Sequence, residues 1–435
     1  DFTSEYRTQL TVSFFYKAIV NALVVKGASI PENLISTTEV KWGNWPVSDG
    51  IQTYKTQDFK APVAKPYIKV TAMYQTSGQT NYTHELAVPP LTLNGAFVQS
   101  QSALMNYYFI NPEKKNTITI AELRVFLKSR FPTFTDIITA ENIKNRGRNY
   151  QGMGSDQPLF AEQLVSYVGQ SIAMILAPTE QDAIKIAAFV STECVQYSKP
   201  GAPWTEQWSE PIIDLLDAIK KGSIFPDAPV SASFASHIWK ITRPGSQFDW
   251  ATNDDTSTPK VLLRDQKINT QEVTVDSVPC TVVSSSQLCG GQAHFYMEPQ
   301  ACIVTPMDEH RMKVQPSVQS PGGMHDTVAS ALGMYHHQIE VEVPAVGGGF
   351  GGKTEQTRFI AGPTAVAAKA TKRPVRLVVP RDEDTAMIGK RHAYYGEYQI
   401  AVDTGSHNEK NKGIIHGFQL KMWGDGGAFY DCSFI

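Results

Sequence analysis

The stretch Val341-Glu-Val-Pro-Ala-Val-Gly-Gly-Gly-Phe-Gly-Gly-Lys-Thr354 contains five glycines among the six residues 347–352. Glycine has no Cβ, so it adopts positive φ readily and lets a ligand approach the backbone. Apolar and acidic residues alternate over 339–343, which predicts a strand before the glycines. The alanine-rich segment 361–372 predicts a helix after them, whose start the Gly-Pro pair at 362–363 should delay or kink. A glycine loop between a strand and a helix directs backbone N–H groups at phosphate.

This glycine loop matches two phosphate-binding patterns. Gly347 and the triplet Gly352-Lys-Thr354 match G-x-x-x-x-G-K-[ST], the P-loop. Gly347, Gly349 and Gly352 also match G-x-G-x-x-G, the dinucleotide fingerprint. A third interpretation is that the loop holds another phosphorylated cofactor, and a fourth is a flexible turn. The loop alone does not decide between them.

Composition and charge are those of an ordinary globular protein. The 435 residues are 42% hydrophobic and 19% charged, with a net charge of -3. This length provides for roughly two or three domains. A nucleic-acid-binding face is not predicted, because such a face is basic. No uninterrupted run of about 18 apolar residues is present, so we expect no membrane span.

The cysteines are Cys194, Cys280, Cys289, Cys302 and Cys432, an odd number without a C-x-x-C pair. In a chain of this length, that pattern favours reduced thiols in a cytosolic protein. It also argues against zinc or an iron–sulfur cluster held by this chain alone.

Patterning along the chain divides it into five segments. Residues 1–26 predict one amphipathic helix, and residues 27–65 an extended connector. Residues 66–198 predict a compact α+β domain, residues 199–235 a proline-rich connector, and residues 236–435 a second, α/β domain. The predicted fold class is therefore α+β or mixed α/β.

Apolar periodicity and turn residues locate individual elements within these segments. Strands are predicted at 67–72, 95–98, 171–177, 260–263, 272–275 and 374–379. Helices are predicted at 121–127, after the capping residue Thr179, within 211–221, and at 326–332 before the terminating Gly333. We interpret the acidic run 382–384 as a turn or helix cap. Histidines 336–337 predict a solvated turn rather than a metal pair, because adjacent side chains do not share a face.

A second glycine-containing segment is Gly290-Gly-Gln-Ala-His-Phe-Tyr-Met-Glu298. Its glycine pair allows close approach to the backbone beside Gln292, and an amide offers both a donor and an acceptor to an oxo group. Taken alone, Gln292 fits a buried and paired core amide at least as well.

Together, the two glycine segments resemble those of the molybdenum hydroxylases, the family of xanthine dehydrogenase and aldehyde oxidase. Three further stretches support the resemblance: Arg373-Pro-Val-Arg376, Asp382-Glu-Asp384 and Gly389-Lys-Arg-His392. Residues 6–15 resemble the end of that family's flavin domain, and residues 168–175 with 183–188 resemble its hammerhead domain. Nearly the whole chain is therefore covered.

The resemblance implies a fold and an internal fragment. Residues 66–198 would form a hammerhead-type domain, and residues 236–435 the first half of a molybdenum cofactor-binding domain. Residues 1–26 would end a flavin domain, preceded by an iron–sulfur domain. The rest of the molybdenum domain would follow Ile435 and contain the catalytic glutamate base, so we expect no catalytic residue in this chain.

The resemblance also assigns site residues. Gln292 would hydrogen-bond the apical oxygen on molybdenum or the adjoining dithiolene region. Gly349 and the backbone of Phe350 and Gly351 would face the cofactor, and the pterin dithiolene, not a residue, would hold the metal. Thr354 would lie in the substrate pocket. Xanthine-oxidising members have glutamate there and aldehyde oxidases a small or apolar residue, which favours an aldehyde or N-heterocycle over xanthine.

For the whole protein, the resemblance implies molybdenum–molybdopterin together with FAD and two 2Fe–2S clusters. Substrate would be hydroxylated with oxygen from water, and electrons would pass through the clusters and FAD to NAD or oxygen. We expect a homodimer in the cytoplasm, with the peroxisome as the alternative. Its partners would be a small-molecule substrate and the remaining segments of the same polypeptide, with no nucleic acid or membrane.

Three alternatives stay open. A P-loop nucleotide-binding protein would use Lys353 on phosphate and Thr354 on Mg²⁺, with Asp382 as the acidic partner. A NAD-binding dehydrogenase needs an acidic residue near 370–374, where none is present. A non-catalytic relative would keep the fold and lack the cofactor.

Overall fold

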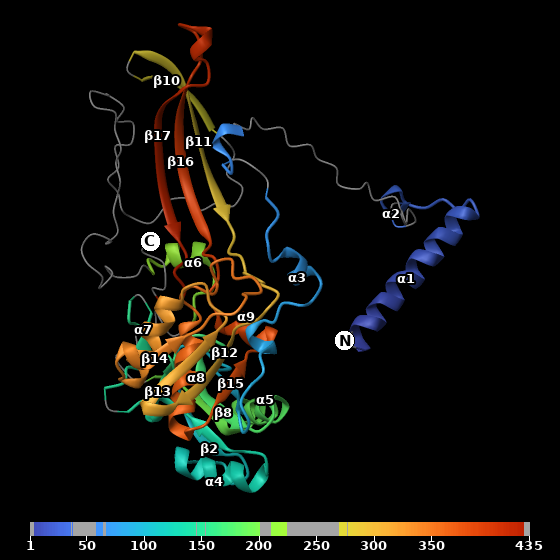
Figure 1. Ribbon diagram of the computed structural model, residues 1–435. Coiled ribbons are helices and arrows are strands. Elements are labelled where there is room, and N and C mark those ends of the chain that lie inside the picture. The colour runs from blue at the N-terminus through green and yellow to red at the C-terminus, as the bar shows by residue number, and fades with distance from the viewer. Residues whose placement is uncertain are drawn as a thin grey trace. The chain divides into compact units, whose positions relative to one another are not determined.

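The computed structural model describes residues 4–35, 37, 58–63, 67–144, 146–152, 154–200, 210–223, 269–275 and 277–429. It separates into two units, Asp1–Ala72 and Met73–Ile435. Figure 1 labels the main helices and strands.

The first unit contains the long helix α1 (Ser4–Val25) and the short helix α2 (Glu32–Ile35). Apolar side chains of α1 are largely exposed, with Phe15 at 68%. Among the described residues, α1 is the one helix long and apolar enough to cross a membrane, over Tyr6–Val25, by length and composition alone. The sequence predicts no membrane span because no uninterrupted apolar run is present. Polar residues interrupt the apolar residues of α1, so this helix does not meet that criterion. An amphipathic helix covered by other chain segments has the same composition.

A central sheet organises the second unit. Among the described residues, seven strands follow the order β14-β13-β12-β15-β1-β8-β4. Their bounds are β1 (Leu93–Gln99), β4 (Asp136–Ile138), β8 (Ser171–Ala177), β12 (Ala301–Met307), β13 (Arg311–Pro316), β14 (Ile339–Val341) and β15 (Val375–Val378). β1 pairs in parallel with β15, placing Leu93 opposite Val375. Strands from the two predicted domains, 66–198 and 236–435, therefore join in one sheet.

Helices cover both faces of this sheet. Side chains alternate along β1, so Phe97 enters one hydrophobic core while Ala96 and Val98 enter another. The first core includes α7 (Pro321–Leu332) and α8 (Arg358–Thr371). The second includes α4 (Ile120–Arg130) and α5 (Glu180–Phe189). The architecture around the central sheet is therefore three layers.

A second, antiparallel sheet brings two of the sequence motifs, residues 290–298 and 389–392, close together. Its order is β10-β11-β16-β17, seen as long ribbons in Figure 1. The bounds are β10 (Asn269–Val275), β11 (Val278–Cys289), β16 (Tyr394–Asp403) and β17 (Ile415–Gly424). β11 ends just before Gly290, and β16 begins just after His392. Because the two strands pair, the start of segment 290–298 lies beside the end of segment 389–392.

Short elements lie in the second unit, apart from the first residue of α3, Ala72, which ends the first unit. The strands are β2 (Met105–Asn111), β3 (Asn116–Thr117), β5 (Tyr150–Gln151), β6 (Gln157–Pro158), β7 (Leu164–Val165) and β9 (Val195–Ser198). The helices are α3 (Ala72–Thr76), α6 (Leu215–Lys220) and α9 (Arg381–Met387).

Several sequence predictions are confirmed. The apolar run 171–177 is β8 and is buried throughout. Thr179 caps α5 by accepting a hydrogen bond from the Asp182 N–H. α7 ends at Gly333, whose φ of 60° is the left-handed conformation that favours glycine at this position. The helix predicted within 211–221 is the shorter α6, which Asp214 caps.

Two predictions are wrong. Residues 67–72 form no strand, and Ile68 and Val70 are 85% and 87% exposed. β-branched residues favour strands only where a partner strand and a core are available. α8 begins at Arg358 instead of being delayed by Gly362 and Pro363. A Cβ at Gly362 would lie 2.8 Å from Leu159, so close packing against the core accounts for this glycine within the helix. The strand predicted at 260–263 lies outside the described residues.

Candidate functional site

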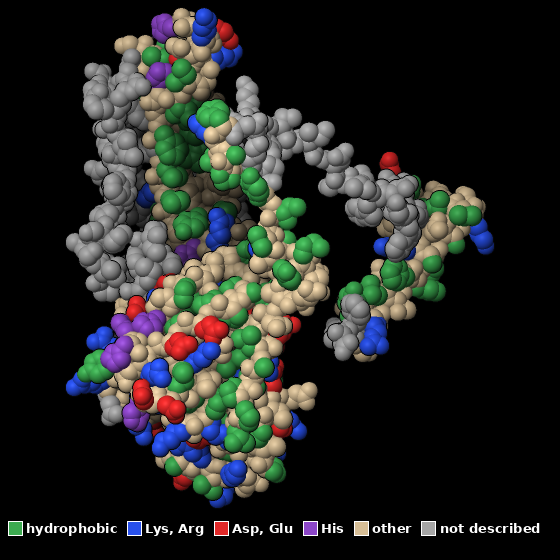
Figure 2. All heavy atoms as spheres, in the orientation of Figure 1, with side chains coloured by type: hydrophobic (Ala, Val, Ile, Leu, Met, Phe, Trp, Pro, Cys, Tyr) green, Lys and Arg blue, Asp and Glu red, His purple; other side chains and the backbone are tan. Residues whose placement is uncertain are grey.

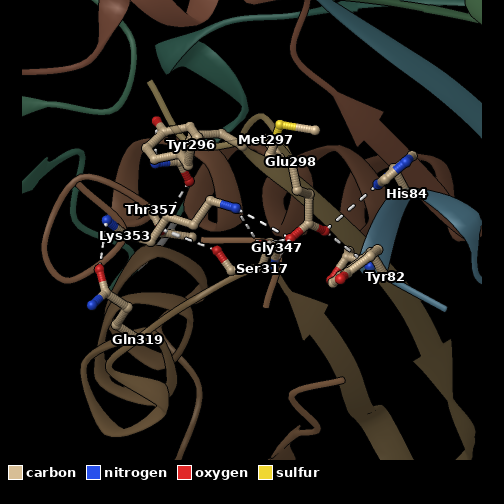
Figure 3. A network of polar contacts seen from close by, with 12 residues as sticks. Tyr82, His84, Tyr296, Met297, Glu298, Ser317, Gln319, Gly347, Lys353 and Thr357 are labelled. Carbon is tan, nitrogen blue, oxygen red and sulfur yellow. Dashed lines mark hydrogen bonds and ion pairs between the residues drawn. The ribbon is translucent and has the colours of Figure 1, made fainter. Parts of the chain in front are cut away.

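The two glycine segments meet at Glu298 (Figure 3). The Glu298 N–H donates to the Gly347 carbonyl at 3.1 Å, and the Gly347 N–H donates to Glu298 Oε2 at 2.8 Å. The Ser317 hydroxyl also donates to Oε2, at 2.7 Å. The end of segment 290–298 is thus fixed to the start of the loop 347–352.

Lys353 points into this network rather than towards solvent. Its side chain is 0% exposed, and Nζ lies 3.2 Å from Glu298 Oε2. Nζ also donates to the Ser317 hydroxyl at 2.7 Å and lies 4.7 Å from the centre of the Tyr296 ring. The P-loop interpretation is therefore wrong, because a lysine paired inside the protein does not reach a nucleotide phosphate.

Glu298 is held as a carboxylate. Burial raises the pKa of Glu298. Hydrogen bonds from Ser317 and Gly347 and the charge of Lys353 lower this pKa by more than burial raises it, so the pKa lies below its usual value. The other oxygen, Oε1, accepts from the Thr83 N–H at 3.0 Å and lies 3.7 Å from His84 Nδ1. One carboxylate therefore joins residues from three distant parts of the second unit.

A second buried carboxylate, Asp384, ties the acidic run to the same place. Its two oxygens accept from the Tyr296 hydroxyl at 2.7 Å and the Gln300 N–H at 2.8 Å. The Gln300 amide donates onward to the Gly352 carbonyl at 2.8 Å. The run 382–384 lies in the first turn of α9, as a helix-terminal interpretation predicts. No carboxylate pair for acid–base chemistry is formed by Asp384, whose oxygens are occupied by N–H and O–H donors.

The Gln319 side chain packs against the glycine loop and bonds to its backbone. No sequence pattern predicts a role for this residue. Its side-chain oxygen accepts from the N–H groups of Gly351 at 3.0 Å and Lys353 at 3.3 Å. A Cβ at Gly349 would lie 2.4 Å from that oxygen. Gly349 is predicted to face the cofactor, but the Gln319 side chain occupies the space into which a Cβ at Gly349 would point. No motif surrounds Gln319, so no local signal could have found it.

Phe350 and Gly351 form the open part of the loop. Phe350 has φ 50° and is 73% exposed. Gly351 has φ 93°, and nothing lies within 4 Å of the position a Cβ would take. The Thr354 side chain is half-buried, and its hydroxyl donates to the Gly351 carbonyl at 2.7 Å.

Gln292 is also exposed, which is contrary to a core amide. Its backbone exchanges hydrogen bonds with Arg391 at 3.1 and 2.9 Å, and its side-chain oxygen accepts from Arg391 Nη1 at 3.1 Å. The neighbouring His294 packs against the glycine loop, since a Cβ at Gly352 would lie 2.7 Å from its ring. Segments 290–298, 347–352 and 389–392 thus form one cluster with an accessible backbone surface.

Comparison with known families explains why these motifs cluster. Residues 77–199 match the a/b hammerhead domain of aldehyde oxidase and xanthine dehydrogenase. Residues 258–435 match the molybdopterin cofactor-binding domain. Together the two matches cover most of the second unit.

Curated relatives extend the similarity over almost the whole chain. Xanthine dehydrogenase of Oryza sativa subsp. japonica is 26% identical over 436 residues, which cover 99% of this chain and 27% of the relative. Indole-3-acetaldehyde oxidase of Arabidopsis thaliana is 28% identical over 432 residues, covering 98% of this chain and 28% of the relative. The chain therefore spans less than a third of the length of these relatives.

Solved structures share the fold. Aldehyde oxidoreductase from Desulfovibrio gigas matches with a TM-score of 0.53 and 19% identity, covering 77% of this chain and 32% of that one. Quinoline 2-oxidoreductase from Pseudomonas putida 86 matches with a TM-score of 0.52 and 19% identity, covering 78% and 37%.

The fold is thus a hammerhead domain joined to a molybdopterin cofactor-binding domain. The chain belongs to the molybdenum hydroxylase family, which includes xanthine dehydrogenase and aldehyde oxidase.

Proposed function

We propose that this chain is the part of a molybdenum hydroxylase that holds one side of the molybdenum–molybdopterin cofactor. The whole enzyme would oxidise an aldehyde, purine or N-heterocycle with water as the oxygen source. The observation that supports this most is the fixed contact between the two glycine segments at Glu298, which leaves Phe350 and Gly351 exposed. A cofactor that carries phosphate and a polar metal centre needs backbone donors without intervening side chains.

The donor set fits this cofactor. Gly290 and Gly351 both have open space where a Cβ would stand, so backbone can be approached closely at each. The exposed Gln292 amide, held by Arg391, offers an orientable donor to an oxo group. In this proposal Gln292 and the backbone of Phe350 and Gly351 would orient the cofactor, and the cofactor itself supplies the two-electron redox chemistry. Gly349 would contribute through its N–H alone, because Gln319 fills its other side.

The substrate class is proposed from Thr354. A glutamate at that position would add a charge for binding a purine, whereas the Thr354 hydroxyl is bonded to the Gly351 carbonyl. An aldehyde or an N-heterocycle is therefore favoured over xanthine. The catalytic glutamate base, FAD, the two 2Fe–2S clusters and the route of electrons to NAD or oxygen belong to the rest of the polypeptide. Dimerisation and a cytoplasmic or peroxisomal location are further parts of the proposal.

The test uses the full polypeptide that contains this chain, produced in cells that make the cofactor. Metal analysis by mass spectrometry and fluorescence of released, oxidised pterin should give close to one molybdenum and one pterin per chain. Turnover should then be measured with an aromatic aldehyde, an N-heterocycle and xanthine under the same conditions. Absence of molybdenum and pterin would contradict the proposal and favour the non-catalytic relative. Xanthine as the best substrate would overturn the preference drawn from Thr354.

A further inference from the structure

Three potential metal ligands lie together outside the glycine cluster. They are His325 and Asp326 on α7 and His336 in the 3₁₀ helix η7 (His336–Gln338). One ligand atom from each lies within 4.8 Å of the others. In Figure 2 histidine side chains gather on the surface where Figure 1 labels α7 and β14.

The turn after α7 produces this juxtaposition. Gly333 adopts the left-handed conformation that ends the helix and reverses the chain. η7 then lies against α7, with the rings of His325 and His336 centred 5.0 Å apart. No local pattern predicts this pairing, because the adjacent His336 and His337 do not share a face and His325 is eleven residues upstream of His336.

The separations suit a tetrahedral transition-metal ion. Ligand atoms in such a site lie roughly 3.3–3.4 Å apart, given metal–ligand bonds of about 2.0–2.1 Å. His336 Nε2 lies 3.4 Å from Asp326 Oδ1, so this pair already has that spacing. Small rotations of the exposed Asp326 and His336 side chains would bring the third ligand into range.

His325 is oriented as a metal-binding histidine is. Its Nε2 lies 3.1 Å from the Ile339 carbonyl oxygen, which accepts a hydrogen bond from the Nε2–H. This bond leaves Nδ1 unprotonated and able to bind a metal ion. Such a carbonyl partner also fixes the orientation of the ring and its tautomer. An ordinary surface ion pair between Asp326 and His336 would not require His325 to be held in this way.

We propose that His325, Asp326 and His336 form a binding site for a divalent transition-metal ion such as Zn²⁺, with one position open to water. Imidazole and carboxylate ligands suit Zn²⁺, and a mixed nitrogen–oxygen set disfavours Mg²⁺ and Ca²⁺. His336 lies in η7, which is followed directly by β14. An ion bound by His325, Asp326 and His336 would therefore hold α7 against the start of the strand that precedes the glycine loop. The proposal does not depend on the molybdenum cofactor.

The experiment is equilibrium dialysis of the full polypeptide against Zn²⁺, with bound zinc, molybdenum and iron measured separately by mass spectrometry. The wild-type protein should bind one more zinc than His336→Ala and Asp326→Asn, or bind it at least about tenfold more tightly. His337→Ala is the matched control: this histidine stacks on Tyr335 and lies outside the cluster, so binding should equal wild type.

Two results would overturn the proposal. One is equal zinc binding by the wild-type protein and His336→Ala. The other is zinc binding that disappears in Cys289→Ser, since this exposed thiol is an alternative zinc ligand. Thermal unfolding provides a second measurement: Zn²⁺ should raise the unfolding temperature of wild type and of His337→Ala but not of Asp326→Asn.

Discussion

The inner and outer faces of the glycine loop differ in what surrounds them. On the inner face, Cβ atoms at Gly347, Gly349 and Gly352 would meet protein atoms at 2.5, 2.4 and 2.7 Å. On the outer face, formed by Phe350 and Gly351, a Cβ at Gly351 would meet nothing within 4 Å. A single run of glycines therefore meets two requirements. The inner glycines allow the loop to pack on its own support, and the outer residues leave backbone accessible.

The largest effect should come from breaking the buried ion pair beneath the inner face. Lys353→Met leaves the Glu298 carboxylate buried without its cation, which should cost about 3–5 kcal/mol of stability. The measurement is the opening free energy of peptides around residues 83 and 347, obtained from hydrogen exchange of the full polypeptide. Lys369→Met is the matched control, because Lys369 Nζ donates to the backbone carbonyl of Leu332 instead of pairing with a buried carboxylate.

The double variant Glu298→Gln/Lys353→Met sharpens this prediction. Removing both charges leaves no uncompensated ion, so part of the lost stability should return. If Lys353→Met costs no more than Lys369→Met, the pair does not hold the inner face, and the comparison between the two faces fails.

The next largest effect should follow from Gly347→Ala. The new Cβ would fall 2.5 Å from Glu298 Cβ, a rigidly placed atom, so the loop must shift. Overpacking of this kind costs about 1–3 kcal/mol. Gly322→Ala is the control, because nothing lies within 4 Å of a Cβ at Gly322 in the first turn of α7. Thermal unfolding of the two variants measures the difference, and equal stability would show that the inner face tolerates side chains.

Much of the fold could be predicted from local patterns. The apolar run of β8, the Thr179 cap and the Gly333 terminus are set by short-range chemistry, and each was predicted correctly. The shared sheet was not, because nothing in residues 93–99 indicates that their parallel partner is 375–378. The early start of α8 was not predicted, because Gly362 was interpreted as a residue that delays or kinks the helix. In the structure this glycine lies inside the helix, where it leaves room for Leu159, a residue distant in sequence.

The candidate site shows the same division. Motif resemblance located the segments that cluster, including Gln292, Phe350 and Gly351. It did not distinguish the inner glycines from the outer one, since both kinds have the same letter in the sequence. The P-loop pattern suggested a phosphate partner for Lys353, whereas its partner in the structure is the buried Glu298 carboxylate. Gln319 was missed because its contacts are to backbone atoms.

A smaller effect on stability, with a larger effect on cofactor, should follow from Gly351→Ala. The positive φ of 93° strains an alanine by about 1–2 kcal/mol, and no clash is added. If the outer face holds the cofactor, molybdenum content should fall more in Gly351→Ala than in Gly347→Ala after each is normalised to folded protein. The reverse order would place the cofactor elsewhere. Metal analysis and pterin fluorescence of both variants provide the measurement.

The smallest change should appear in the acid limb of the stability profile. The pKa of Glu298 is lowered in the folded protein by Ser317, Gly347 and Lys353 against the opposing effect of burial. The unfolded chain therefore binds this proton more readily. The contribution of Glu298 is complete above its unfolded pKa of about 4.3 and is lost as pH falls through the lower folded value.

Glu298→Gln removes this titration and leaves the other carboxylates unchanged. The stability difference between wild type and Glu298→Gln should therefore be constant near neutral pH and shrink as pH falls from about 5 to 3. Denaturant unfolding across this range measures it, with Glu113→Gln, at an exposed ion pair, as the control that shows little change. A difference that grows in acid would mean that burial outweighs the three donors. In that case the inner face would rest on a protonated Glu298, and the ion pair would not be what separates it from the outer face.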